Sequence, residues 1–404
     1  MKNGVGRLGL LALLAVLTTT ALAGNREERL RARADSRLAL MGIEAPSVLL
    51  AEADHYAVYG APTGGFVILA KGENADSADS SDPSVLGYST TVFDADSLPC
   101  GLRWWLDAID EVLRQGAPRR AATNYSRMDD FLETKWGQDA PYNMLCPTAS
   151  GYATKTGCMA TAMAQVMRYF HWPEHGIGQG GYYLGGRSSR YFHPEAVESY
   201  YDWDAMEYQK LSNAPENAKI AVATLMYDCG KACNTFYSTG ASFASEQDLL
   251  PALINHFQYD ARTMRFCERA QYSGSQWLEM VYDELQNRRP IFYSGYLEDG
   301  ITGHAFVLCG MDEEGKVYVN WGQDGRYDGF YSIDALILSG IDLTHAQTMI
   351  IGVQPSGATG VSAATLPAKD EVTKCYTLSG LPATGHHKGI RLVRQGTTVR
   401  KVVR

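Results

Sequence analysis

Cys158 has the sequence surroundings of a reactive thiol. It follows Gly157, and residues 159–170 are strong helix formers that are apolar nearly all round, so we predict a buried helix that begins at the cysteine. The helix should end before His171-Trp172-Pro173, because proline disfavours helix in the residue ahead of it. The positive end of a helix dipole favours the thiolate, which is the nucleophilic form. A plain buried cysteine is the alternative that this segment leaves open.

His304 is the histidine whose context best suits a base for that thiol. Residues 303–310 are expected to form a strand, 312–315 a turn and 316–322 the returning strand, so the hairpin would carry new side chains back to His304. Without a nucleophilic cysteine, the simpler interpretation of His304 is a structural histidine. Together with Cys158 it forms a candidate thiol–imidazole pair.

Two residues of the returning strand compete for contact with His304. Asn320 could accept a hydrogen bond from the imidazole and fix its orientation, and Trp321 could shield that contact from water. A symmetric turn places Trp321 on the face of His304, whereas a one-residue bulge reverses the faces, because side chains alternate along a strand. The sequence leaves this choice open.

A turn-rich loop over residues 136–143 lies ahead of the nucleophile and contains Gln138. An amide side chain near the attacked carbonyl can donate a hydrogen bond to the developing oxyanion, with the backbone N–H of Cys158 as a second donor. Gln138 is therefore a candidate oxyanion residue. Tyr296, Thr302 and Gly303 are candidate substrate-binding residues, because they lead directly to His304.

The order of elements divides the chain into several parts. Residues 24–122 are expected to form a separate unit, with a charged helix over 25–39, strands over 55–59, 65–70 and 85–89, and an amphipathic helix over 102–115. Arg119-Arg120 then lies in an exposed linker, as a processing site or an ordinary surface loop. Residues 123–354 mix helices and strands in one α+β unit. A Gly/Ala/Ser/Pro-rich linker over 355–373 leads to a basic β-like tail over 374–404, with strands over 390–394 and 398–403.

The first 23 residues have the form of a signal peptide. Lys2 and Arg7 are followed by a short apolar run over 8–17 and by Ala21-Leu22-Ala23, the small-x-small pattern of a cleavage site. The run is too short for a permanent membrane span. A buried N-terminal helix is the alternative. We therefore expect an exported protein.

Composition narrows the function further. The length of 404 residues is enough for two or three domains, and 45% hydrophobic residues are enough for a large core. The formal charge of −9 disfavours nucleic acid as a partner. If one of the 8 cysteines is a free nucleophile, an odd number remains, so at least one more must stay unpaired or pair outside the chain. No paired motif with metal-ligand spacing occurs. We predict neither a metal nor an organic cofactor.

These motifs together resemble the streptopain family of papain-like cysteine proteases. The resemblance covers nearly all of residues 125–354 and is carried by Trp136-x-Gln138-x-x-Pro141-Tyr142-Asn143, Thr156-Gly157-Cys158-x-Ala160-Thr161-Ala162-x-Ala164-Gln165-x-Met167-x-Tyr169, Gly303-His304-Ala305-Phe306-Val307, Asn320-Trp321-Gly322 and Asp328-Gly329-Phe330. It implies a papain-like α+β fold and endopeptidase activity. It also implies that Cys158 is the nucleophile, His304 the imidazole, Gln138 the oxyanion residue, and Asn320 and Trp321 the support of the histidine.

The resemblance extends to both flanks of the catalytic region. Residues 24–122 resemble the inhibitory propeptide of the family, which implies a zymogen cleaved near Arg120. The last residues resemble a C-terminal sorting domain of type IX secretion, which implies secretion machinery as a partner and export through the periplasm. One departure is Gln323-Asp324-Gly325 after Gly322, where the family has another tryptophan and a glycine, so the shape of the subsites is open.

The implied reaction is acyl transfer from a peptide to Cys158 and then to water, with protein or peptide substrates. Two alternatives belong to other functional classes. One is a catalytically silent, secreted binding protein on the same fold, and the other is a thiol acyltransferase, because fold alone does not determine function.

Overall fold

A computed structural model describes residues 26–71, 85–114, 125–186, 189–296, 303–333, 347–357, 374–376, 390–395 and 398–403. The predicted signal peptide, the Arg119-Arg120 pair, Thr302 and most of the 355–373 linker lie outside these ranges. Two compact units occur, Met1–Gly357 and Ala358–Arg404. The first contains every described residue of the candidate site.

A ten-stranded antiparallel sheet runs through the first unit, in the order β1-β2-β3-β4-β13-β12-β11-β10-β14-β9. Its strands are β1 (Val48–Glu52), β2 (Tyr56–Gly60), β3 (Phe66–Ala70), β4 (Val85–Ser89), β9 (Arg265–Glu268), β10 (Ile291–Tyr296), β11 (Gly303–Met311), β12 (Val317–Asn320), β13 (Gly329–Tyr331) and β14 (Gln347–Ile351). Short pairs form elsewhere between β5 (Thr148–Ala149) and β6 (Tyr152–Ala153), and between β7 (Gln179–Gly186) and β8 (Ser189–Ala196).

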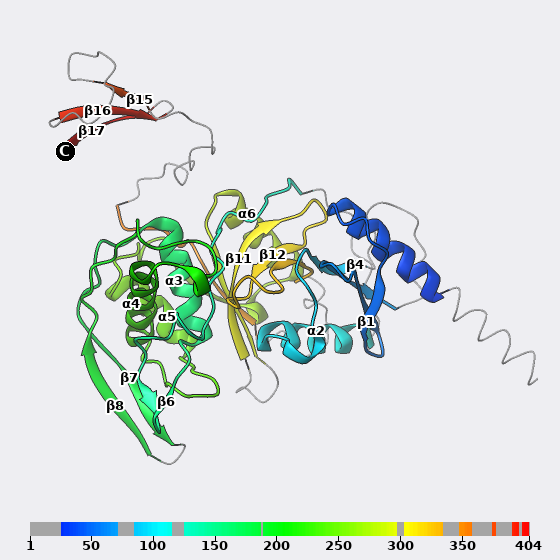
Figure 1. The fold of residues 1–404 in the computed structure, drawn as a ribbon, viewed down its shortest axis with the longest axis horizontal. Helices are drawn as coiled ribbons and strands as arrows, with labels where there is room; N and C mark the ends of the chain where they lie inside the picture. The colour runs from blue at the N-terminus through cyan, green and yellow to red at the C-terminus, as the bar shows by residue number, and fades with distance from the viewer. Residues whose placement is uncertain are drawn as a thin grey trace, which may run out of the picture. The chain divides into compact units, whose positions relative to one another are not determined.

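The N-terminal unit predicted over 24–122 continues the sheet of the α+β unit. Its last strand, β4, pairs with β13 through Tyr88↔Phe330 and Gly87↔Tyr331. A helix over 26–40 covers this end of the sheet (Figure 1). It buries Leu30, Ala34 and Leu38, which lie on one face at a spacing of four residues, against strand residues that include Val67.

Helices cover the other end of the sheet. α3 (Cys158–Phe170), α4 (Glu216–Ala232) and α5 (Glu246–Asn255) form a layer beside the strands, and the β7–β8 hairpin extends from it (Figure 1). α6 (Gly274–Gln286) packs on β10 and β11, and α2 (Cys100–Arg114) also packs against these two strands. The described residues of the unit also form the 3-10 helices η2 (Ala95–Ser97), η3 (Leu211–Asn213) and η4 (Arg269–Gln271).

The second unit contains a three-stranded antiparallel sheet of β15 (Lys374–Tyr376), β16 (Ile390–Gln395) and β17 (Thr398–Val403). The two strands predicted over 390–394 and 398–403 are thus present. Among the described residues, no helix is long and apolar enough to cross a membrane.

Candidate active site

Cys158 is the first residue of α3, as predicted from its sequence. Gly157 precedes the helix with φ of 91°, in the region that favours glycine, and a Cβ there would lie 3.0 Å from the carbonyl oxygen of Ser242. The helix continues to Phe170, and His171 then adopts a left-handed conformation. Residues 159–168 are buried, so the thiol is carried by an element that is fixed on most sides.

His304 lies in β11, which begins at Gly303, and is only 1% exposed. Ala305, the next residue, contacts the candidate nucleophile, because its backbone N–H points to Cys158 Sγ at 3.5 Å. The imidazole Nε2 donates to the Trp321 carbonyl oxygen at 3.0 Å. Nε2 therefore fixes the orientation of the imidazole, and Nδ1 is the nitrogen that can face a thiol.

The strand register decides between Asn320 and Trp321. Val307 pairs with Asn320 and Leu308 with Val319, and an irregularity follows between Leu308 and Met311. Trp321 consequently shares the face of His304, and its ring centroid lies 6.5 Å from that of the imidazole. The bulge lies on the turn side of Leu308 and does not exchange the faces beside His304.

Asn320 points away from the imidazole and holds neighbouring backbone. Its Nδ2 donates to the Thr134 carbonyl at 2.7 Å, and its Oδ1 accepts from Gln165 Nε2 and from Gly322 N, both at 3.0 Å. Asn320 is buried. Asn320 thus fixes the segment that carries the Trp321 carbonyl, and the imidazole donates to that carbonyl instead of to Asn320.

Asp328 supports the same segment. It is buried, and its Oδ1 accepts the Trp321 backbone N–H at 2.9 Å, while Lys135 Nζ lies 3.4 Å from Oδ2. Burial raises the pKa of Asp328 to about 7, although the Lys135 ammonium opposes that shift. Asp328 therefore holds the backbone of Trp321, the residue whose carbonyl oxygen contacts the imidazole.

Gln138 is placed next to the nucleophile through its backbone. Its carbonyl oxygen accepts from the Thr156 N–H at 3.1 Å, two residues before Cys158, and its side chain is half-buried. Of the substrate-binding candidates, Gly303 pairs with Tyr296 at the start of β11. Only the backbone of Tyr296 is described.

Cys100, at the first turn of α2 in the N-terminal unit, lies against the candidate base. Its Sγ is 3.1 Å from His304 Nδ1. Gly101 allows this approach, since a Cβ at that position would lie 2.3 Å from the imidazole and 2.8 Å from the Trp321 ring. A thiol from the N-terminal unit thus occupies the ring nitrogen that faces away from Trp321.

The pKa values of the His304 imidazole and the Cys100 thiol shift in opposite directions. Burial opposes the charged form of His304, but Cys100 and then Cys158 outweigh it and raise the pKa of the imidazole. Burial likewise opposes ionisation of Cys100, but His304 outweighs it and lowers the pKa of this thiol. These two shifts are those expected when a thiol and an imidazole in contact stabilise each other's charged forms.

Three residues that contact His304, Asn320 or Trp321 had no role predicted from the sequence, namely Cys100, Gln165 and Asp328. Gln165 and Asp328 lie inside the motifs that carried the resemblance, so their positions were visible without their contacts. Cys100 had no such signal, because its partner is 204 residues away. The described part of the chain contains no group of three or more candidate metal ligands, and the seven cysteines whose side chains are described are free thiols.

Comparison with known proteins identifies the family of the chain. Residues 136–331 match the model of the peptidase C10 family. Streptopain of Streptococcus pyogenes serotype M28 is 28% identical over 332 residues, which cover 74% of this chain and 80% of streptopain. The thiol protease/hemagglutinin PrtT of Porphyromonas gingivalis is 29% identical over 72% of this chain, which spans only 36% of the length of PrtT.

Solved structures extend the similarity to the N-terminal unit. A fragment of prointerpain A from Prevotella intermedia aligns with a TM-score of 0.66 and 32% identity, covering 76% of this chain and 98% of the fragment. Active interpain A covers 59% of this chain and 98% of its own, with a TM-score of 0.50 and 33% identity. The precursor form covers more of this chain than the active form, as expected if residues before the catalytic region are a propeptide. The chain therefore belongs to the peptidase C10 family and is a papain-like cysteine endopeptidase that carries its propeptide.

Proposed function

We propose that Cys158 is the nucleophile of this endopeptidase and His304 its general base and acid. The observation that supports this pairing best is the junction of α3 and β11, where the Ala305 N–H reaches the Cys158 sulfur at 3.5 Å. Both residues belong to rigid, buried elements, which is what holding a thiolate and an imidazole in reacting geometry requires.

In the proposed reaction, the Cys158 thiolate attacks the peptide carbonyl and the C–N bond breaks. His304 protonates the departing amine and leaves an acyl-enzyme, and water activated by His304 then releases the acid. Gln138 and the Cys158 backbone N–H would donate to the oxyanion. Trp321 and Asn320 act as positioning residues, the first on the imidazole and the second on the segment that carries it. Gly303, Tyr296 and Thr302 would border the bound peptide.

The propeptide, residues 24–122, is proposed to keep this site latent through Cys100. His304 Nδ1 is engaged by the Cys100 sulfur at 3.1 Å, so a propeptide thiol competes with Cys158 for the imidazole. Cleavage near Arg120 would separate α2 from the catalytic region over 123–354. Export by the signal peptide, through the periplasm, and recognition of the tail over 374–404 by secretion machinery complete the proposed path.

The assignment is tested with enzyme freed of its propeptide by an added protease. Cys158→Ala is expected to lower peptide hydrolysis at least about a thousandfold and to abolish labelling by a thiol-directed electrophile. Cys146→Ala is the matched control, because Cys146 is a half-buried thiol whose pKa is raised by burial to about 12. Equal hydrolysis by wild type and Cys158→Ala would contradict the assignment.

A further inference from the structure

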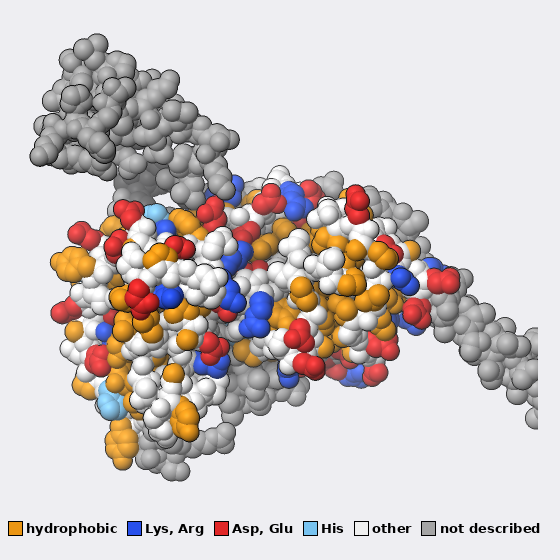
Figure 2. All heavy atoms as spheres, in the orientation of Figure 1, with side chains coloured by type: hydrophobic (Ala, Val, Ile, Leu, Met, Phe, Trp, Pro, Cys, Tyr) orange, Lys and Arg blue, Asp and Glu red, His pale blue; other side chains and the backbone are white. Residues whose placement is uncertain are grey.

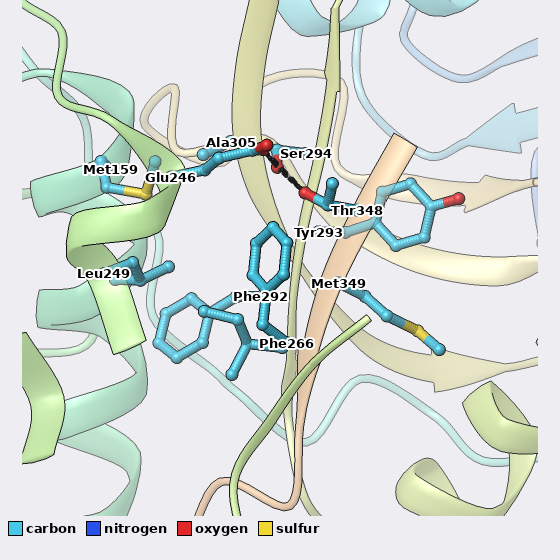
Figure 3. Close-up of a pocket in the computed structure, with 11 residues that line it drawn as sticks. Met159, Glu246, Leu249, Phe266, Phe292, Tyr293, Ser294, Ala305, Thr348 and Met349 are labelled. Atoms are coloured by element: carbon cyan, nitrogen blue, oxygen red, sulfur yellow. Dashed lines mark hydrogen bonds between the residues drawn. The ribbon is translucent and has the colours of Figure 1, made fainter. Parts of the chain in front are cut away.

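A pocket opens directly beside the candidate catalytic pair. Met159 and Ala305, which follow Cys158 and His304 in the sequence, both line it. The remaining walls come from α5, β9, β10 and β14, and Figure 3 shows Leu249, Phe266 and Phe292 around its apolar part. A side chain of a peptide held at Cys158 would meet this pocket within one residue of the reacting groups.

One carboxylate lies among these apolar walls. Glu246, the first residue of α5, faces Ser294 of β10 and Thr348 of β14 (Figure 3). Its Oε2 accepts from Ser294 Oγ at 2.8 Å and from Thr348 Oγ1 at 2.7 Å. Two hydroxyl groups from different strands therefore fix the carboxylate at the pocket, and they use only one of its two oxygens.

Glu246 is partly exposed, and no described lysine or arginine forms an ion pair with it, whereas two of the buried carboxylates do have such a partner. Glu284 is paired with Arg289 at 2.7 Å, and Asp228 with Lys231 at 2.9 Å. A carboxylate among apolar groups is stabilised by a cation. The second oxygen of Glu246 is thus available to a positive charge beside the candidate nucleophile.

We propose that this pocket is a substrate subsite for a basic side chain, with lysine preferred over arginine. The apolar walls suit the methylene stem of such a residue, and Glu246 suits its charged end. This inference rests on the proposed function and adds the class of substrate to it. Glu246 is its specificity-determining residue.

Two features favour lysine within the basic class. Of the two Glu246 carboxylate oxygens, Oε1 accepts no hydrogen bond from the described residues. One available oxygen fits a compact ammonium better than the two-pronged arginine fork. The free space in the propeptide-containing form is about 10 Å³, roughly that of one water molecule. An occupant must displace a wall residue, and Met159 is unbranched and adaptable, so a thin stem enters most easily.

The test uses activated enzyme and peptides that carry lysine, arginine or norleucine at each of the four positions on either side of the cleaved bond. Norleucine has the lysine stem without its charge. At one position we expect wild-type kcat/KM to be highest for lysine. In Glu246→Gln the lysine-to-norleucine ratio should fall roughly tenfold or more, the usual scale of a charge-assisted hydrogen bond.

Glu279→Gln is the matched control, because Glu279 is an exposed acid on α6 and its loss changes the net charge equally. Glu246→Asp, which keeps the charge on a shorter stem, should retain part of the preference. Titration of Cys158 with the thiol-directed electrophile corrects each rate for the amount of folded enzyme.

Equal lysine-to-norleucine ratios in Glu246→Gln and Glu279→Gln at every position would overturn the pocket assignment while peptide cleavage stands. A wild-type enzyme that cleaves no peptide and is not labelled at Cys158 would overturn the protease function and the pocket together. A wild-type preference for arginine over lysine would overturn the argument from the single free oxygen.

Discussion

At the scale of single residues, the candidate base is held by two contacts of different origin. The Trp321 carbonyl is part of the catalytic region and orients Nε2, whereas the Cys100 sulfur belongs to the propeptide and occupies Nδ1. The first contact can persist after activation and the second cannot. This separation makes Cys100 a residue whose loss should affect latency and spare the chemistry.

We therefore expect Cys100→Ala to shorten, by roughly tenfold, the lag before the full-length chain becomes active. The reason is that the substitution removes a hydrogen bond to a charged group. The measurement is hydrolysis of a reporter peptide after dilution of the full chain into reducing buffer. Cys146→Ala should keep the wild-type lag. An unchanged lag for Cys100→Ala would show that the thiol contact does not contribute to latency.

The direction of the pKa shifts sets the pH range of this contact. The raised pKa of His304 means that its stabilisation is present at lower pH and is lost as pH rises through the raised value. The lowered pKa of Cys100 means that its stabilisation is lost as pH falls through the lowered value. The pair is thus strongest at pH values between the lowered pKa of Cys100 and the raised pKa of His304.

At the scale of elements, the helix over 26–40 is tied to the turn between β11 and β12. Arg37 donates to Glu314 at 2.6 Å, and both side chains are largely enclosed. Lys316 is a second partner of Glu314. Burial favours the neutral acid, but Lys316 and Arg37 outweigh burial and lower the pKa of Glu314.

Because that pKa is lowered, the ion pair stabilises propeptide docking at neutral pH and is lost as pH falls below the ordinary glutamate value of about 4.3. Glu314→Gln should weaken docking about fivefold at pH 7, in line with about 1 kcal/mol for a partly exposed pair. It should also flatten the acid response. Binding of the separate propeptide to Cys158→Ala catalytic region, followed from pH 7 to pH 3, measures both effects. A Glu314→Gln profile identical to that of Glu279→Gln would refute the contact's role.

Individual helices and strands could be predicted from the sequence more easily than the contacts between them. The helix that begins at Cys158, strand β4 and the hairpin around 312–315 follow from local signals, namely a glycine before helix formers and apolar runs bounded by turns. The choice between Asn320 and Trp321 required the register, which depends on where the bulge falls. Local sequence does not specify that position.

At the scale of the whole molecule, the propeptide and the catalytic region share one sheet. The pairing of β4 with β13 joins residues more than 200 positions apart, and Phe330 is buried in the same cluster as Leu30 and Val67. The two parts were predicted as separate units because composition and loops mark a boundary, whereas long-range strand pairing leaves no local signal. The contact of Cys100 with His304 could not be predicted for the same reason, because it depends on how the shared sheet and α2 bring the two residues together.

Removal of the propeptide through Cys158 is tested by following the mass of the full-length chain over time in reducing buffer, for wild type beside Cys158→Ala. If Cys158 is the nucleophile, the wild type alone loses about 100 residues from its N-terminal side and then hydrolyses protein substrate. Identical processing of both chains, without any added protease, would contradict a cysteine endopeptidase that acts through Cys158 and is released from its own propeptide.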